Sequence, residues 1–480
     1  MKARIDIPVR LSDGARLGSD ARIAKCCGGC EAAGMTAEPV HIDTHPEPES
    51  RMLGKWMSAA MVVGTMVGSG IYLLPTTLAP FGPNLIVAFI ITGFGTMCLA
   101  FALARMAARI RGGPFVYIDE AFGERTAFLT LWCYTISQIT GVAGVSLAAA
   151  GALGHVYPMV ESGPGLIATA LAAIGILTLV NLRGARSAGM LQVIATLIKL
   201  VPLLVVLLLV LGRFRAGQAV EPLEATPVTI GGVTAAAALI LFSLTGFESA
   251  VMTANVTRDS TSTVPRATIG GTGFTAIIYL LATVATLMIL PSALAAKSSS
   301  PFADAIAPSL GAIAGVVVAV IAAVSAFGTG NALLLIAAES ARTMGQARDL
   351  PAIFARSNRI GAPVGSLLIC AGAAALLVLA STSKNFVSVY VLITLVSTLL
   401  SLVLYAVCAV AALKLKVAGK ATILVVIGVV YSIAMFVGAG TEAFLWSFVL
   451  GAVGFPVRAI SRWLNGSSRA AEATPAAPPG

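Results

Sequence analysis

The chain has 480 residues, of which 58% are hydrophobic and only 11% charged, and its mean hydropathy is +0.93. A composition this apolar excludes a soluble globule for most of the chain and indicates an integral membrane protein. The formal net charge is +10. It does not indicate a nucleic-acid partner, because Lys and Arg gather in the loops expected at the cytoplasmic face, among them Arg109, Arg183 and Lys414.

Apolar runs long enough to cross a hydrocarbon core of about 30 Å recur along the chain. The sequence predicts twelve membrane-spanning helices with both termini in the cytoplasm. They are expected near residues 52–79, 85–108, 126–154, 165–182, 188–212, 231–255, 268–292, 310–340, 364–382, 386–413, 421–438 and 441–458.

The composition changes at both ends of the chain. Residues 1–51 are polar and contain no apolar span, and the chain ends in the run NGSSRAAEATPAAPPG. Segments of this kind cannot bury enough apolar surface to fold alone. We therefore expect a flexible cytoplasmic extension over residues 1–51, a twelve-helix domain over residues 52–460 and a disordered cytoplasmic tail over residues 461–480.

Neither metal binding nor enzyme chemistry is indicated. Cys26, Cys27 and Cys30 in CCGGC precede His41 and His45, but a metal site needs an ordered scaffold that this polar segment lacks. The motifs HExxH, GxSxG and GxxxxGK[ST] are absent from the sequence. We expect no metal, no cofactor, no enzymatic activity and no disulfide among the four cysteines of the apolar spans: Cys98, Cys133, Cys370 and Cys408.

Small residues interrupt the first predicted span. In Val62–Pro75, VVGTMVGSGIYLLP, the residues Gly64, Gly68, Ser69 and Gly70 fall where the helix should be most regular. Glycine costs about 0.5–1 kcal/mol relative to alanine inside a helix, and freed backbone groups in hydrocarbon cost several kcal/mol more. The interruption serves either close packing of helices, through a small-xxx-small motif, or a binding site.

The sixth predicted span is interrupted at a corresponding place. In Leu239–Val256, LILFSLTGFESAVMTANV, the residues Ser243, Thr245, Gly246 and Glu248 cluster near the middle. Two apolar segments broken at matching places in two halves of a chain are typical of inverted-repeat transporters, whose site lies at the midplane. The pair of interruptions favours a binding site over packing.

The broken ends indicate what would bind. The first helix runs outward, so its second half, predicted to begin near Ile71, presents unpaired N–H groups and a positive dipole end at mid-membrane. The sixth helix runs inward, so its first half, predicted to end near Ser243–Thr245, presents unpaired carbonyl groups. A carboxylate and an ammonium on one carbon would satisfy both ends. An α-amino acid is therefore a better candidate than a sugar or an inorganic ion.

Ionisable residues inside predicted spans have two interpretations each. Lys199 in the fifth span either extends its ammonium to an interface or has a function. Glu248 is either a proton carrier or the centre of a structural hydrogen-bond network. Glu339 near the inner end of the eighth span is expected to pair with Arg342.

Four motifs occur in the order found in a known superfamily. They are GTMVGSGIYLLP in the first span, GGPFVYIDEAFG from Gly112, FSLTGFESA followed by VPRATIGG from Val264, and LPAIFARSNRIGAPV from Leu350. On these motifs the chain resembles the amino acid-polyamine-organocation superfamily, within it the basic amino acid/polyamine antiporter family, and in particular its arginine/agmatine antiporters. The resemblance implies an all-α membrane protein with the LeuT-type fold, a 5+5 inverted repeat of ten helices in which helices one and six are broken.

The resemblance also implies a substrate site. The turn formed by Gly68, Ser69 and Gly70 would hold the substrate carboxylate, and carbonyl groups around Phe242 and Leu244 would hold its α-amine. Both assignments agree with the argument from the helix ends.

Other positions of the family's site bear on the substrate side chain. Thr65 replaces an asparagine of the arginine/agmatine antiporters, and Tyr134 retains an aromatic residue. Phe242 and Leu333 stand where those antiporters carry tryptophans. Cation–π stacking contributes about 0.5–2 kcal/mol and is strongest on tryptophan. A guanidinium group should therefore be held more weakly in this chain.

Two residues carry the expected coupling. Glu248 matches a glutamate that the family associates with proton sensitivity. Lys199 resembles a lysine of sodium-independent relatives, whose ammonium takes the place of a sodium ion beside the first-helix break. The arginine/agmatine antiporters lack this lysine.

The leading interpretation is a secondary active antiporter of the arginine/agmatine type that works by alternating access. A proton-coupled permease or exchanger for neutral amino acids is the alternative, favoured by Lys199 and the missing tryptophans. A sensor would need a soluble reporting domain, and a channel would need a visible filter or charged ring. The expected partners are an amino acid or its decarboxylated amine, the lipid of the cell inner membrane and, as an open alternative, a second copy of the chain in a homodimer.

Overall fold

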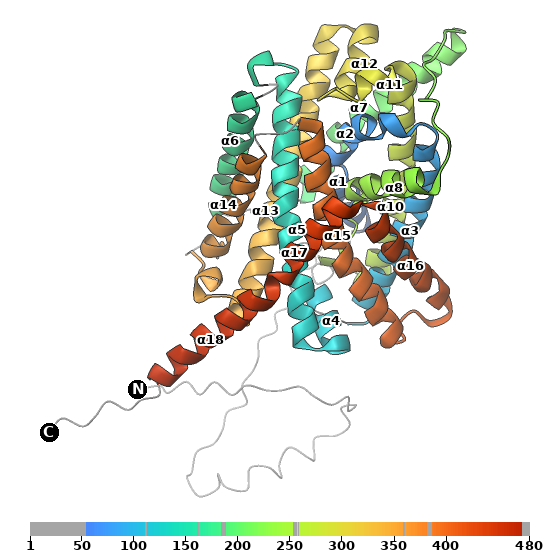
Figure 1. Cartoon of the computed structure of the whole chain (residues 1–480). Helices are drawn as coiled ribbons and strands as arrows, with labels where there is room; N and C mark the ends of the chain where they lie inside the picture. Colours follow the sequence, from blue (N-terminus) through green and yellow to red (C-terminus); the bar gives the residue numbers. More distant parts are fainter. Residues whose placement is uncertain are drawn as a thin grey trace, which may run out of the picture. The chain divides into compact units, whose positions relative to one another are not determined.

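The computed structural model describes residues 54–110, 113–160, 163–183, 189–252, 257, 259–358, 361–381 and 386–472. All of them belong to one unit of the chain, Glu49–Gly480, and every regular element among them is a helix (Figure 1). The predicted extension over residues 1–51 lies outside the described residues.

The helices follow one another in the order of the predicted spans. The first seven helices are α1 (Lys55–Met66), α2 (Ser69–Leu78), α3 (Asn84–Ala107), α4 (Pro114–Phe122), α5 (Glu124–Gly154), α6 (Gly163–Leu182) and α7 (Gly189–Arg215). The remainder are α8 (Ile230–Leu244), α9 (Ser249–Met252), α10 (Ser260–Ile289), α11 (Ser292–Ala295), α12 (Pro301–Leu310), α13 (Ala312–Gln346), α14 (Val364–Ala380), α15 (Phe386–Lys414), α16 (Thr422–Gly438), α17 (Thr441–Ala452) and α18 (Gly454–Glu472). Short 3-10 turns lie at Ala79–Phe81, Pro158–Val160, Ala352–Ala355 and Gly419–Ala421.

Nine helices of the described residues are long and apolar enough to cross a membrane, and a tenth span is formed if the bent pair of α1 and α2 counts as one. The chain is therefore a multi-pass helical membrane protein. The apolar helices α14 and α16, which match the ninth and eleventh predicted spans, have only 17 residues each. At 1.5 Å per residue they are about 26 Å long, short of a hydrocarbon core of about 30 Å. The count of twelve spans, like the 5+5 repeat, remains a prediction.

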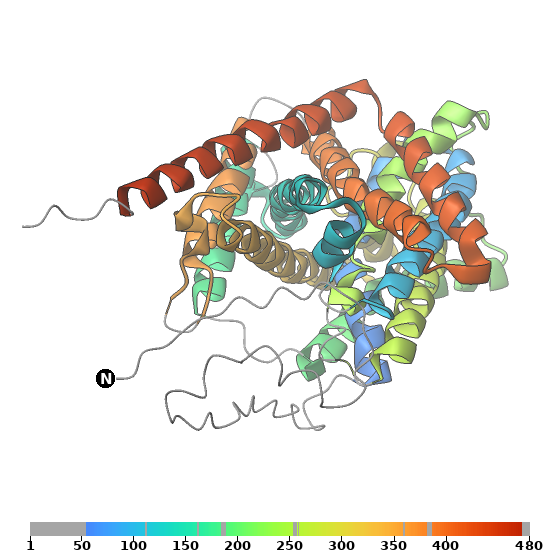
Figure 2. The ribbon, with the colours of Figure 1, turned by 90° about the horizontal axis from the view of Figure 1, so that it is seen from below.

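Helix α5 lies at the centre of the helices. Of the 18 consecutive residues that make up its apolar stretch, 89% are buried. Figure 2 shows this helix (teal) enclosed by its neighbours. Small residues such as Ala143, Gly144 and Ala150 let α13 and α15 approach closely, which is how helices associate in lipid. At Gly151 an added Cβ would lie 2.9 Å from the ring of Phe386.

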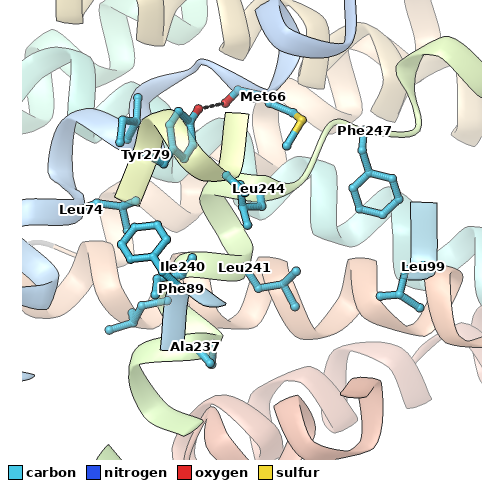
Figure 3. Close-up of a cluster of buried hydrophobic side chains, with 14 of the residues drawn as sticks. Met66, Leu74, Phe89, Leu99, Ala237, Ile240, Leu241, Leu244, Phe247 and Tyr279 are labelled. Carbon is cyan, nitrogen blue, oxygen red and sulfur yellow. Dashed lines mark hydrogen bonds between the residues drawn. The ribbon is translucent and has the colours of Figure 1, made fainter. Parts of the chain in front are cut away.

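Large buried side chains join α8 to the broken first span. Figure 3 shows Leu241 and Leu244 of α8 in one cluster with Leu74 of α2, Phe89 of α3 and Tyr279 of α10. All five are at most 2% exposed. Because helices in lipid are held by van der Waals packing, this cluster fixes where the ends of α1, α2 and α8 lie.

Helix α18 continues to Glu472, beyond residue 461, where the sequence led us to place the start of a tail. Its Arg458 and Arg462 each donate through Nε to Oδ1 of the buried Asp349, at 2.8 and 2.9 Å. The same two arginines also pair with Glu124 at the start of α5. These ion pairs hold the first half of α18 against the ends of α5 and α13.

Candidate functional site

The first span breaks at Val67 and Gly68. In an unbroken helix the N–H of Gly68 would bond to the carbonyl of Gly64, but it bonds instead to Met66 O at 2.8 Å. Gly68 itself is extended (φ −118°, ψ −152°), and α2 starts at Ser69 with a bend of 43° between the two halves. The break expected from the glycines is therefore present, about two residues earlier than predicted.

The sixth span breaks after Leu244, the last residue of α8. Thr245 is extended, and its hydroxyl and N–H both donate to Phe242 O, at 2.7 and 3.2 Å. Gly246 has φ +105°, a conformation that L side chains rarely adopt. The predicted end at Ser243–Thr245 agrees with this geometry.

The two breaks lie against each other. The Thr65 hydroxyl is 3.0 Å from Gly246 O and 3.0 Å from Ser249 Oγ, which joins the end of α1 to the connection between α8 and α9. An added Cβ at Gly70 would lie 2.5 Å from Ser243 Oγ, and one at Gly68 would lie 2.6 Å from Thr329 Oγ1. Both glycines therefore have a steric function: Gly70 lets the two breaks approach each other, and Gly68 lets the first-span break approach α13.

A cavity of 1820 Å³ surrounds both breaks. It extends along α4 to the C-terminal halves of α3 and α13, the side on which the sequence predicts the cytoplasm. All but one of the residues expected at the site line this cavity: Thr65, Gly68, Ser69, Gly70, Tyr134, Lys199, Phe242, Glu248 and Leu333. Leu244 does not line it, because its side chain is fully buried in the cluster of Figure 3.

Glu248 is buried beside the break of the sixth span, with 6% of its surface exposed. Its Oε1 accepts from the Tyr134 hydroxyl at 3.0 Å, and its Oε2 accepts from the Gly246 N–H at 3.0 Å. The carboxylate thereby connects α5 to the connection that follows α8. A change of its charge would act on both elements at once.

Lys199 is 8% exposed and points toward the first-span break. Its Nζ donates to Gly64 O at 3.3 Å, the carbonyl that lost its helical partner at the break. The Tyr72 hydroxyl of α2 donates to the backbone carbonyl of Lys199 at 2.6 Å. Lys199 therefore does not extend to an interface, and α7 is tied to both halves of the first span.

Two polar residues of the cavity wall add to the expected site: Gln138, which we did not single out from the sequence, and Ser243, which we placed at the sixth-span break without a binding role. Gln138 Oε1 and Ser243 Oγ are buried in its wall and have no hydrogen-bond partner within the described part of the chain. Buried polar atoms normally have partners, so both are suited to a polar ligand. A glutamine in an apolar span was a usable signal, since its amide needs a partner in lipid.

An apolar cluster closes the other side of the site. Leu73, Ala148 and Tyr390 are buried together and pack against Phe242 and Phe386. The rings of Phe242 and Tyr390 meet edge to face, with centroids 6.4 Å apart. The cavity that lies beyond Ser69 has a volume of 10 Å³, too small for an amino acid. The structure therefore has the site accessible from one side.

No group of three or more potential metal ligands occurs in the described residues. The cysteines Cys98, Cys133, Cys370 and Cys408 are buried as free thiols. The N-terminal residues Cys26, Cys27, Cys30, His41 and His45, considered above as metal ligands, lie outside the described residues.

The sequence of the chain is similar to those of known transport proteins. The sequence pattern of the family described as amino acid permease matches residues 53–421. A protein described as an arginine/ornithine antiporter from Bacillus subtilis is 27% identical over 78% of this chain and 86% of its own length. The putrescine transporter PotE of Escherichia coli is 28% identical over 85% of this chain and 96% of its own length. The cadaverine/lysine antiporter of Escherichia coli is 27% identical over 67% of this chain and 73% of its own length.

Proposed function

The chain belongs to the amino acid permease family, a family of membrane transporters, and we propose that it exchanges a basic amino acid for its decarboxylated amine. The arginine/agmatine pair is the specific proposal. The single observation that carries it is the pair of broken spans whose ends meet in one cavity. Relatives named for arginine/ornithine, putrescine and cadaverine/lysine support the substrate class.

The α-carbon groups of the amino acid bind at the breaks. Within the described residues, no carbonyl or side chain accepts from the N–H groups of Ser69, Gly70 or Ile71 at the start of α2. A substrate carboxylate placed there accepts from them and is stabilised by the positive end of α2. We place the α-amine at the opposite end, by the carbonyl groups that close α8 around Phe242 and Leu244. Because Phe242 O already accepts twice from Thr245, we assign the contact to the carbonyls next to it.

The charges of the cavity favour a cationic substrate. Glu248, Asp259 and Glu339 are the carboxylates that line it, whereas Lys199 is its one lining ammonium among the described residues. A cavity with an excess of one sign concentrates ligands of the opposite sign. The rings of Phe242 and Tyr134, which line the same cavity, offer faces for stacking on a guanidinium.

Glu248 carries the coupled proton in this proposal. It is the ionisable acid beside the breaks, and its hydrogen bonds reach both α5 and the connection after α8. Lys199 supplies a fixed positive charge at Gly64 O, where a sodium-coupled transporter would use an ion. Transport is therefore independent of sodium.

Alternating access follows from the same parts. The cluster around Phe242 and Tyr390 closes one side of the site while the cavity extends to the other. Transport to the second side requires this cluster to separate and the region around α4 to close. Twelve spans, the inverted relation of the two sets of five, a place in the inner membrane and a homodimer belong to this proposal.

The second candidate is an exchanger or proton-coupled permease for neutral amino acids. Lys199 and the apolar Leu333 favour it, because both remove attraction for a cationic side chain. The carboxylate and α-amine of a neutral amino acid would bind at the breaks in the same way as those of arginine.

Exchange in proteoliposomes separates the two candidates through charge. Arginine for agmatine moves one net charge per cycle, worth about 2.3 kcal/mol at 100 mV, whereas exchange of two neutral amino acids moves none. Arginine, leucine and methionine are compared with and without a valinomycin potential. The proposal predicts exchange of arginine for agmatine that responds to the potential. The arginine/agmatine proposal is refuted if leucine or methionine is exchanged at a rate that does not respond to the potential and if excess arginine does not compete with them.

A further inference from the structure

The break of the first span frees carbonyl groups as well as N–H groups. In a continuous helix the carbonyls of Gly64 to Val67 would accept from the N–H groups four residues later. Met66 O accepts from the Gly68 N–H at 2.8 Å, and the structure also supplies three side-chain donors to these carbonyls. These are the Lys199 ammonium on Gly64 O at 3.3 Å, the Tyr279 hydroxyl on Met66 O at 2.6 Å and the Ser325 hydroxyl on Val67 O at 3.3 Å.

Tyr279 has no part in the function proposed above. It belongs to α10, its ring is fully buried, and Figure 3 shows its hydroxyl directed at the carbonyl of Met66. The two residues are 213 positions apart in the chain. Ser325 reaches the next carbonyl from α13 and is also fully buried.

The helical partners of these two carbonyls identify what is protected. Met66 O would pair with the N–H of Gly70, and Val67 O with the N–H of Ile71, if the helix re-formed across the break. Both N–H groups are among those that the proposed function assigns to the substrate carboxylate. With the Gly68 N–H and the Tyr279 hydroxyl, Met66 O has both lone pairs occupied. The Ser325 hydroxyl occupies one lone pair of Val67 O, so both carbonyls compete less for the two N–H groups.

We infer that Tyr279, assisted by Ser325, is a positioning residue that keeps the Gly70 and Ile71 N–H groups available to the substrate carboxylate. The inference rests on the proposed function, because it concerns the carboxylate subsite of the same cavity. It adds a specificity rule: Tyr279 matters for ligands that carry a carboxylate and not for amines that lack one.

A purely structural role of Tyr279 gives a different result. If its hydroxyl only satisfied a buried carbonyl, which is a general requirement in proteins, its removal would loosen the whole site. Amino acid and amine would then lose affinity together. The ratio of the two affinities therefore distinguishes positioning from general stability.

The test is calorimetric binding of arginine and agmatine to the purified protein and to Tyr279→Phe, which keeps the ring. We expect the affinity for arginine to fall about tenfold, equivalent to about 1.4 kcal/mol, and that for agmatine to stay within twofold. Tyr431→Phe is the matched control, since Tyr431 of α16 is also buried but packs against Gly95 of α3. It should change neither affinity.

Equal losses for arginine and agmatine, or no loss for arginine, overturn the inference. Should Tyr279→Phe fail to fold, as judged by size-exclusion chromatography, Ser325→Ala must show the same selective loss, and its absence there overturns the inference equally. If the unaltered protein binds neither arginine nor agmatine, the proposed pair is wrong. The comparison is then made with lysine and cadaverine or ornithine and putrescine, on which the inference stands or falls separately.

Discussion

A single methyl group at Gly70 tests whether the two breaks form the binding site. The Cβ of Gly70→Ala would lie 2.5 Å from Ser243 Oγ and 3.0 Å from Ser243 Cα. The Cα is backbone and cannot rotate away, so α2 and α8 must separate. Overpacking of this kind costs about 1–3 kcal/mol of stability. Because the substrate needs both breaks together, we take this cost as the loss of binding free energy, which corresponds to roughly 5- to 150-fold in affinity. We expect arginine binding to weaken within that range.

The matched control is Gly175→Ala in α6. No atom lies within 4 Å of an added Cβ at that position, so the substitution introduces the same methyl group without a clash. Both variants are purified, checked for a monodisperse elution profile and titrated with arginine by calorimetry. The reasoning is refuted if Gly70→Ala binds within twofold of the unaltered protein, or if Gly175→Ala loses as much affinity.

Three further substitutions test other parts of the site and fold. Lys199→Ala removes the donor to Gly64 O and should lower exchange at least fivefold, while the unaltered protein shows no sodium dependence; a tenfold stimulation by sodium would contradict this. Glu248→Gln keeps a side chain able to bond to Tyr134 but cannot carry a proton, so the pH profile of exchange should flatten, and an unchanged profile would exclude Glu248 as the coupling group. Asp349→Ala leaves the guanidinium of Arg458 without its buried partner, a loss of about 3–5 kcal/mol in buried pairs, and should lower the melting temperature of the purified protein. A melting temperature equal to that of the unaltered protein would show that this ion pair contributes nothing.

The broken spans could be predicted because their signal is local. Glycine and polar residues inside an apolar run have an energetic cost wherever the run is placed, and Gly68 and Gly246 lie at the observed breaks. The residue at which each half begins depends on a few backbone angles, and the start of α2 was therefore misplaced by about two residues.

The donors to the break could not be predicted in the same way. Tyr279 and Ser325 lie in apolar spans where a tyrosine or serine is unremarkable, and their acceptors are backbone carbonyls 213 and 258 positions away. Leu244 shows the converse difficulty. The resemblance implied a role for its backbone carbonyl. The sequence could not show that the Leu244 side chain itself is buried in the core and does not line the cavity.

The carbonyl groups and the N–H groups freed by the breaks differ in whether the protein supplies them with hydrogen-bond partners. The carbonyls of Gly64, Met66 and Val67 each accept from a side chain, and Phe242 O accepts twice from Thr245. The N–H groups at the start of α2 have no such acceptor in the described part of the chain.

This asymmetry has a consequence for exchange. Since the freed carbonyls are largely satisfied internally while the freed N–H groups are not, the unmet need of the site is for an anion, and a carboxylate supplies it. In the proposed exchange, a decarboxylated amine would leave the N–H groups unpaired and would rely on the carboxylates and aromatic faces of the cavity. The amino acid and the amine thus bind through different groups, so that variants at the start of α2 should change the affinity for one substrate without changing it for the other.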